Sequence, residues 1–144
     1  MDKVLVVDDE FILRDLMRTI LEEEGFSVIT ASDGEEALTK ADSELPDLII
    51  LDLMMPGKSG LEVCKILKSQ SATKHIPVVM ATVLGREVDR TLTKEAGANA
   101  HFMKPFSALA LLIEVKHQLE VVRESRPPPQ LERSLSLNSI PMSA

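Results

Sequence analysis

The 144-residue chain has no tryptophan or tyrosine, a single cysteine and no long apolar run. Cys64 cannot form a disulfide within the chain and fits a reducing compartment, so we expect a packed thiol in a cytoplasmic protein. Without an apolar run of about 18 residues, a membrane span is excluded. Met1 leads almost directly into a strand pattern, so no secretory signal is expected before the domain.

Basic residues are also scarce, since 16 lysines and arginines stand against 23 acidic residues for a net charge of -7. A surface that binds nucleic acid needs a basic face to neutralise phosphates. We therefore expect that this domain does not bind nucleic acid by itself. Residues 125–144 carry two arginines and one glutamate, so the negative excess lies in residues 1–124.

Apolar runs alternate with amphipathic stretches along most of the chain, which predicts strands alternating with helices. The expected strands are residues 3–7, 27–31, 47–52, 77–82 and 100–103. The expected helices are residues 11–24, 34–43, 59–69, 86–96 and 106–123. Five strand–helix repeats imply a parallel sheet with helices on both faces.

The composition changes after Glu124. Residues 127–129 are three consecutive prolines, which cannot continue a helix, and serine is frequent in the residues that follow. We expect one folded domain at residues 1–124 and a flexible tail or linker at residues 125–144 that begins as polyproline II.

Acidic residues end two of the apolar runs: Asp8 and Asp9 follow the first strand, and Asp52 ends the third. Strand 27–31 is more polar than the others and fits an edge position, which places the first and third strands at the point where the strand order reverses. A crevice opens there at the carboxyl ends of the strands, so the three carboxylates should share a pocket. Such a pocket needs a cation or a proton, and oxygen ligands indicate Mg²⁺ rather than zinc.

Thr82 ends the fourth strand and Lys104 follows the fifth, so a hydroxyl and an ammonium should face the same crevice. Together with three carboxylates, these groups suit phosphoryl transfer onto a carboxylate. We expect Asp52 to be the nucleophile. Lys104 would pair with Asp52 and then with the phosphoryl oxygens, to which Thr82 would donate its hydroxyl.

The expected metal ligands are drawn from the same loops. Mg²⁺ would lie between Asp9, Asp52 and the backbone carbonyl of Met54. Asp8 would hold a water molecule coordinated to the metal.

The chain resembles the receiver domain of a two-component response regulator, either a stand-alone one like the chemotaxis regulators or one that belongs to a longer regulator. The matching segments are Asp8–Asp9, residues 46–57, Thr82 and Lys104–Pro105–Phe106, and the resemblance covers about residues 2–122. It implies a flavodoxin-like α/β fold with five helices and a doubly wound sheet of order 2-1-3-4-5. It also implies Mg²⁺-dependent transfer from a phosphohistidine of a sensor histidine kinase or phosphotransfer protein to Asp52, followed by hydrolysis.

The resemblance further implies that phosphorylation draws Thr82 inward and shifts the surface of the fourth helix, fifth strand and fifth helix. Family members often carry an aromatic residue three positions before the lysine, where this chain has His101. His101 is either a switch residue, sensitive to pH near its titration range, or a half-exposed strand-end histidine without that role.

Three apolar residues are expected to govern access to Asp52 and the lifetime of its phosphoryl group. Val83 stands where the family often has alanine, and its larger side chain would narrow access for small phosphodonors. By resemblance, Met54 and Leu84 flank the path of the attacking water, which neither side chain can orient. We therefore expect slow autodephosphorylation. The alternative is that both side chains only cover the pocket.

Helix 106–123 is more apolar than one packed face requires. One stripe at helical spacing is Ala108, Leu112, Val115, Leu119 and Val122, and the surplus residues are Leu109, Leu111 and Ile113. The surplus favours a partner surface, such as a homodimer through the fourth helix, fifth strand and fifth helix. A broad core face is the alternative.

Two other functional classes were weighed against the phosphoacceptor switch. An Mg²⁺-dependent aspartyl phosphatase would need a second aspartate two residues after its nucleophile, where this chain has Met54. We therefore expect no enzyme beyond self-catalysed phosphotransfer and autodephosphorylation. An unphosphorylated pseudo-receiver would be expected to lack an acidic or lysine position, and none is missing. The sequence does not identify the kinase, the output target or the oligomeric state.

Overall fold

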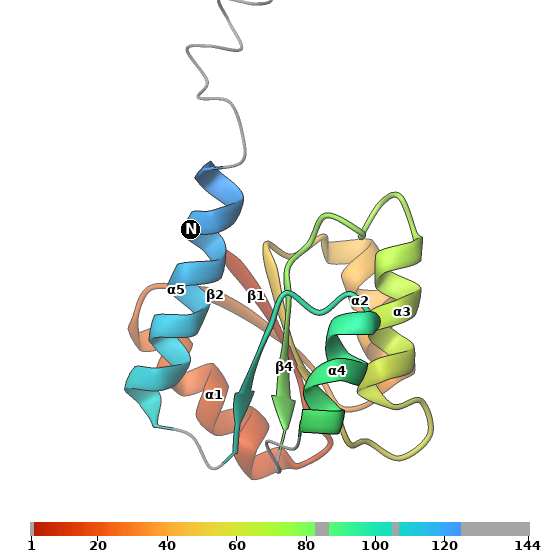
Figure 1. Cartoon of the computed structure of the whole chain (residues 1–144). Helices are drawn as coiled ribbons and strands as arrows, with labels where there is room; N and C mark the ends of the chain where they lie inside the picture. Colours follow the sequence, from red (N-terminus) through yellow and green to blue (C-terminus); the bar gives the residue numbers. More distant parts are fainter. Residues whose placement is uncertain (1, 83–86, 105–106, 125–144) are drawn as a thin grey trace, which may run out of the picture.

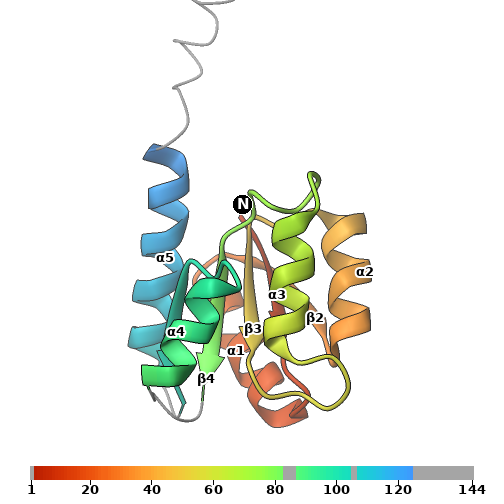
Figure 2. The same ribbon diagram turned by 45° about the vertical axis from the view of Figure 1, so that its right-hand side comes forward.

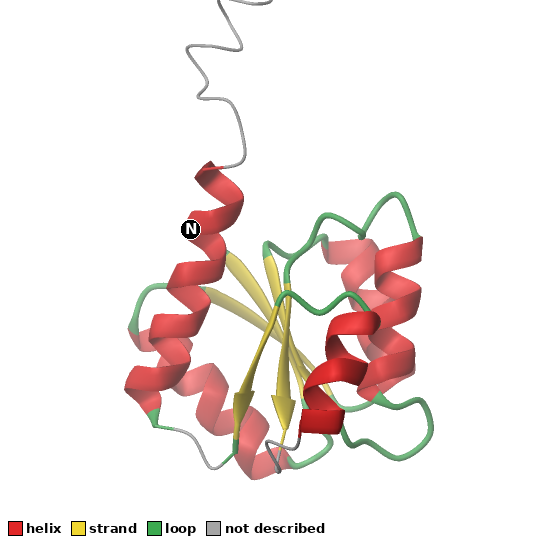
Figure 3. Ribbon diagram, viewed as in Figure 1, coloured by secondary structure: helices red, strands yellow, loops and turns green. Residues whose placement is uncertain are grey.

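The computed structural model describes residues 2–82, 87–104 and 107–124, which form five strands and five helices in alternation (Figures 1 and 3). The strands are β1 (Lys3–Val7), β2 (Ser27–Ala31), β3 (Leu48–Asp52), β4 (Val78–Thr82) and β5 (Ala100–Met103). The helices are α1 (Phe11–Glu23), α2 (Gly34–Glu44), α3 (Gly60–Ser69), α4 (Glu87–Glu95) and α5 (Ala108–Glu124).

The strands pair in parallel in the order β2-β1-β3-β4-β5, which confirms the predicted doubly wound α/β fold. The more polar β2 lies at the edge of the sheet, as its composition indicated. Because β1 and β3 lie next to each other, their carboxyl ends meet at one edge of the sheet.

Two apolar layers enclose the sheet, because alternate strand residues point to opposite faces. The helices α1 and α5 cover one face, and α2, α3 and α4 lie on the other (Figure 2). The strand residues buried under α1 and α5 are Val4, Val6, Leu48, Ile50 and Val79. Those buried on the opposite face are Leu5, Val7, Ala31, Ile49, Leu51, Val78 and Met80. Strands buried on both faces are rigid supports for the residues at their ends.

The packed face of α5 differs from the predicted stripe. Leu111, predicted as surplus, is fully buried with Val115 in the layer shared with α1. Ala108, predicted to lie on the stripe, is exposed. The rest of the stripe is confirmed, because Val115 and Leu119 are buried in this layer and Leu112 packs against it. The packed face is therefore the predicted stripe widened by Leu111, with Ala108 left outside it. The large apolar residues of α5 that stay exposed are Leu109, Ile113 and Val121.

Side chains of α3 hold the segment that follows α4. The Lys68 ammonium donates hydrogen bonds of 3.2 and 2.7 Å to two backbone carbonyls before β4, and one of 3.0 Å to Asn99 Oδ1. One turn earlier, Cys64 Sγ donates to the carbonyl of Ala96 at 3.4 Å. Burial lowers the pKa of Lys68 and raises the pKa of Cys64 to about 11, so Cys64 is the packed thiol that was predicted.

Both ends of the described chain lie at the sheet edge opposite the carboxyl ends of the strands. Arg123 in the last turn of α5 forms an ion pair with Asp2. Figure 1 shows the N-terminus beside the end of α5. The predicted tail, residues 125–144, lies outside the described residues. Within the described part of the chain, no helix is long and apolar enough to cross a membrane.

Candidate functional site

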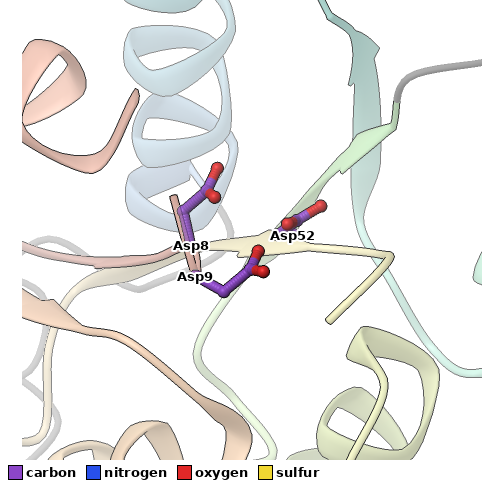
Figure 4. Close-up of side chains that lie close together, drawn as sticks. All are labelled: Asp8, Asp9 and Asp52. Atoms are coloured by element: carbon purple, nitrogen blue, oxygen red, sulfur yellow. The ribbon is translucent and has the colours of Figure 1, made fainter. Parts of the chain in front are cut away.

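Asp8, Asp9 and Asp52 come together at the carboxyl edge of the sheet. Asp8 and Asp9 follow the end of β1, and Asp52 is the last residue of the neighbouring β3. One carboxylate oxygen from each residue lies within 4.8 Å of the other two (Figure 4). Asp8 is fully buried and Asp52 is 3% exposed, whereas Asp9 is exposed. The structure therefore forms the acidic pocket that the sequence predicted.

Lys104 is the cation of this pocket. Its buried ammonium lies 2.8 Å from Asp8 Oδ2 and 3.3 Å from Asp52 Oδ1. The predicted pairing with Asp52 is present, but the shorter contact is to Asp8. Lys104 therefore lies between two carboxylates that are buried and shielded from solvent.

Asp8 is fixed through each of its polar groups. Its N–H donates to the carbonyl of Ala31 at 3.2 Å, and its Oδ1 accepts the N–H of Glu10 at 2.9 Å. Its carbonyl oxygen accepts a 2.8 Å hydrogen bond from Arg14 Nη1, while Lys104 binds Oδ2. Sequence analysis missed Arg14, although an arginine in the first turn of a helix that starts at the acidic loop was an available signal.

The charges of the pocket shift the titration of its members. Burial raises the pKa of Asp52 from its usual 3.8 to about 6, and the charge of Asp8 adds to this against the opposing effects of Lys104 and the Met54 N–H. Burial acts to lower the pKa of Lys104, but the hydrogen bond to Asp8 and the charges of Asp52 and Asp8 outweigh it and raise that pKa. Lys104 therefore stays charged, whereas burial and the charge of Asp8 disfavour the ionised form of Asp52.

The turn after β3 holds Asp52 in place. The Met54 N–H donates to Asp52 Oδ1 at 3.2 Å, while the Met54 side chain is 71% exposed. Gly60 begins α3 directly against the strand end, and a Cβ at this position would lie 2.3 Å from the Asp52 carbonyl oxygen. A side chain at residue 60 would therefore displace α3 or the phosphoacceptor candidate itself.

The other four predicted residues differ in how far the structure describes them. The backbone of Thr82 ends β4 and pairs with Met103, but its side chain is outside the described part. Val83 and Leu84 also lie outside the described residues. His101 is half-buried in β5, beside a surface pocket that Lys94 and Asn99 also line.

The donor set fits a divalent cation. Among the residues that the structure describes, three carboxylates within 4.8 Å of one another face one ammonium, so this part of the pocket carries an excess of negative charge. Oxygen-only ligands are those that Mg²⁺ prefers in proteins. Asp8, Asp9 and Asp52 are the described residues that would hold such an ion.

The chain belongs to the response regulator receiver domain family, whose family model matches residues 4–116. It is therefore a receiver domain of two-component, phosphorelay signal transduction, as the sequence motifs indicated. Among solved structures, the chemotaxis protein CheY4 of Vibrio cholerae is similar with a TM-score of 0.77 and 35% identity, over 83% of this chain and 98% of that one. This likeness agrees with the predicted flavodoxin-like receiver fold.

Curated relatives are transcriptional regulators. The chain is 48% identical over 114 residues to the alkaline phosphatase synthesis transcriptional regulatory protein PhoP of Bacillus subtilis, covering 79% of this chain and 47% of that protein. It is 42% identical over 114 residues to the phosphate regulon transcriptional regulatory protein PhoB of Escherichia coli, covering 79% and 50%. The chain thus spans about half the length of these relatives.

Proposed function

We propose that Asp52 is the phosphoacceptor of this receiver domain and that its donor is a phosphohistidine of a sensor histidine kinase or phosphotransfer protein. The observation that carries the proposal is the arrangement around Asp52. Lys104 and the Met54 N–H both contact Oδ1, at 3.3 and 3.2 Å. Among the described residues, no hydrogen bond reaches Oδ2, so we take this oxygen as the one that attacks phosphorus.

In the proposed transfer, Asp52 Oδ2 forms a bond to phosphorus as the phosphorus–nitrogen bond of the donor breaks. The histidine nitrogen keeps the bonding electron pair. The Lys104 ammonium lies 3.3 Å from Asp52 and forms an ion pair with Asp8. In the transfer, Lys104 hydrogen-bonds the incoming phosphoryl oxygens while the ion pair with Asp8 keeps its ammonium in place. Thr82 is the proposed hydroxyl donor to the same oxygens. Mg²⁺, when bound, supplies positive charge against the phosphoryl group.

Intact-mass spectrometry after incubation with Mg²⁺ and a phosphodonor tests this assignment. A single phosphate adduct is expected for the wild type, and none for Asp52→Asn or in the presence of EDTA. Asp42→Asn, which changes an exposed aspartate of α2, is the matched control and should keep the adduct. If Val83 blocks small donors, beryllofluoride binding followed by NMR replaces the adduct as the readout. An adduct on Asp52→Asn would contradict the assignment.

We further propose that the phosphoryl group on Asp52 is lost slowly. The exposed Met54 side chain stands next to the phosphoacceptor and has no group that orients water, and Leu84 is expected to act alike. Met54→Asn should accelerate decay several-fold, because an amide can hydrogen-bond the attacking water. Decay is followed by mass spectrometry after the donor is removed. Equal decay of the wild type and Met54→Asn would refute this role.

The proposed output surface is the face formed by α4, β5 and α5, where a partner or a second copy of the chain would dock. Exposed large apolar residues on these elements are Leu92, Met103, Leu109, Ile113 and Val121. His101 of β5 is a candidate switch residue within this face. We further propose that this face binds an output protein or domain or forms a homodimer, and that the protein is cytoplasmic. We also propose that the acidic domain does not itself bind nucleic acid.

A further inference from the structure

We propose that Arg14 is a positioning residue for the metal site: it holds the peptide between Asp8 and Asp9 so that the Asp9 carboxylate points into the pocket. This inference rests on the proposed function, because it takes Mg²⁺ to be the ion bound there. Arg14 itself would touch neither the ion nor the phosphoryl group.

The contact that carries the inference is made to the backbone. Arg14 Nη1 donates a 2.8 Å hydrogen bond to the carbonyl oxygen of Asp8. That oxygen belongs to the same planar peptide unit as the N–H of Asp9. Fixing the oxygen therefore fixes the plane of the peptide and the direction in which the chain continues to the Asp9 Cα.

The guanidinium of Arg14 is itself held in place. It lies over the ring of Phe11, the first residue of α1, at 5.5 Å from the ring centroid. A cation–π contact of this kind restricts the side chain to the side of the helix that faces the acidic loop. Arg14 therefore links the start of α1 to the end of β1.

Asp9 needs such support more than its neighbours do. Asp8 is held by Lys104 and the Glu10 N–H, and Asp52 by Lys104 and the Met54 N–H. Within the described part of the chain, no hydrogen bond or ion pair holds the exposed Asp9 carboxylate. It lies within 4.8 Å of two other carboxylates, whose charges repel it. Its backbone is therefore what keeps it directed into the pocket.

Isothermal titration of the full chain with Mg²⁺ tests the role of Arg14. Arg14→Gln is expected to weaken Mg²⁺ binding by about tenfold, the loss typical of removing a residue that orients a metal ligand. The direction is diagnostic, because removing a nearby positive charge without any loss of geometry would strengthen the binding of a cation. Arg18→Gln is the matched control, since Arg18 lies on the same helix and pairs with Asp15 and Glu22 at the surface. It should leave the affinity unchanged.

A double-mutant cycle tests whether Arg14 acts through Asp9. Asp9→Asn should weaken Mg²⁺ binding, and adding Arg14→Gln should then cause little further loss. Independent, multiplicative losses, or an unchanged affinity of Arg14→Gln, would overturn the inference. If Arg14→Gln does not fold, Phe11→Ala decides, because it frees the guanidinium at an exposed position and should weaken binding by a smaller factor.

The outcomes separate this inference from the proposed function. A wild-type chain that binds no Mg²⁺, or binds it equally well after Asp52→Asn and Asp9→Asn, would refute the metal site as a whole. A wild type that binds, with Asp9→Asn weakened and Arg14→Gln unaffected, would refute only the role of Arg14.

Discussion

Replacing Lys104 with methionine is expected to lower the free energy of unfolding of the metal-free domain by about 3–5 kcal/mol at pH 7. The methionine side chain fills a similar volume but removes the ammonium that lies 2.8 Å from Asp8 and 3.3 Å from Asp52. Both carboxylates are buried, so they would be left without their cation in a medium that solvates charge poorly. Few other single substitutions in this domain should destabilise it as much.

Urea unfolding followed by circular dichroism measures this loss, since the chain has no tryptophan or tyrosine to report it. The loss should shrink in acid, where Asp52 takes up a proton, and Mg²⁺ should restore more stability to Lys104→Met than to the wild type. Lys116→Met is the control, because Lys116 pairs with Glu24 at the exposed surface and should contribute less than about 1 kcal/mol. A similar small loss for Lys104→Met would mean that water or another group solvates the pocket.

Asp52→Asn is expected to have the opposite effect and to raise the free energy of unfolding in EDTA at pH 8 by roughly 3 kcal/mol. Burial and the neighbouring Asp8 raise the folded-state pKa of Asp52 from 3.8 to about 6. The folded domain then binds this proton more tightly than the unfolded chain does. The stability that this group contributes is therefore present in acid and lost as the pH rises through about 4 to 6. Asparagine carries no such charge.

Unfolding experiments between pH 4 and 8 test this dependence. The difference between Asp52→Asn and the wild type should be small near pH 4 and reach its full size near pH 7. Asp42→Asn changes an exposed aspartate, so its difference from the wild type in the free energy of unfolding should not increase with pH. Millimolar Mg²⁺ should stabilise the wild type more than Asp52→Asn and so reduce or reverse the difference. If the difference in the free energy of unfolding does not change with pH, the folded domain does not disfavour the ionised form of Asp52.

The acidic pocket was predictable because β1 and β3 are buried on both faces, whereas the strand order followed from the polar edge strand β2 and the resemblance to receiver domains. A buried parallel strand appears in the sequence as a continuous apolar run, and Asp8, Asp9 and Asp52 stand where two such runs end. The sheet topology then brings the ends together. No tertiary detail beyond the order of strands was needed for this part of the site.

Details that depend on side-chain packing were not predictable. The preference of Lys104 for Asp8 over Asp52 depends on how far each carboxylate lies from the end of β5. The contact of Arg14 depends on where α1 starts its first turn. Helix α2 ends at Leu45, which adopts the left-handed conformation with φ 44°. Glycine or asparagine usually occupies such a position, so the leucine did not indicate a helix end in the sequence. Each feature depends on groups that meet only in the folded domain.

The bonds from Lys68 and Cys64 attach the C-terminal end of α4 to α3. Any displacement of α4 that preserves these bonds is a rotation about that end, and the movement grows along the helix toward its first residue, Glu87. Over nine residues the helix is about 13 Å long, so a rotation of about 10° moves its first turn by about 2 Å. That first turn follows β4, the strand that ends at Thr82. If the proposed switch at Asp52 acts through α4, the length of this helix sets how far its N-terminal end moves at the surface.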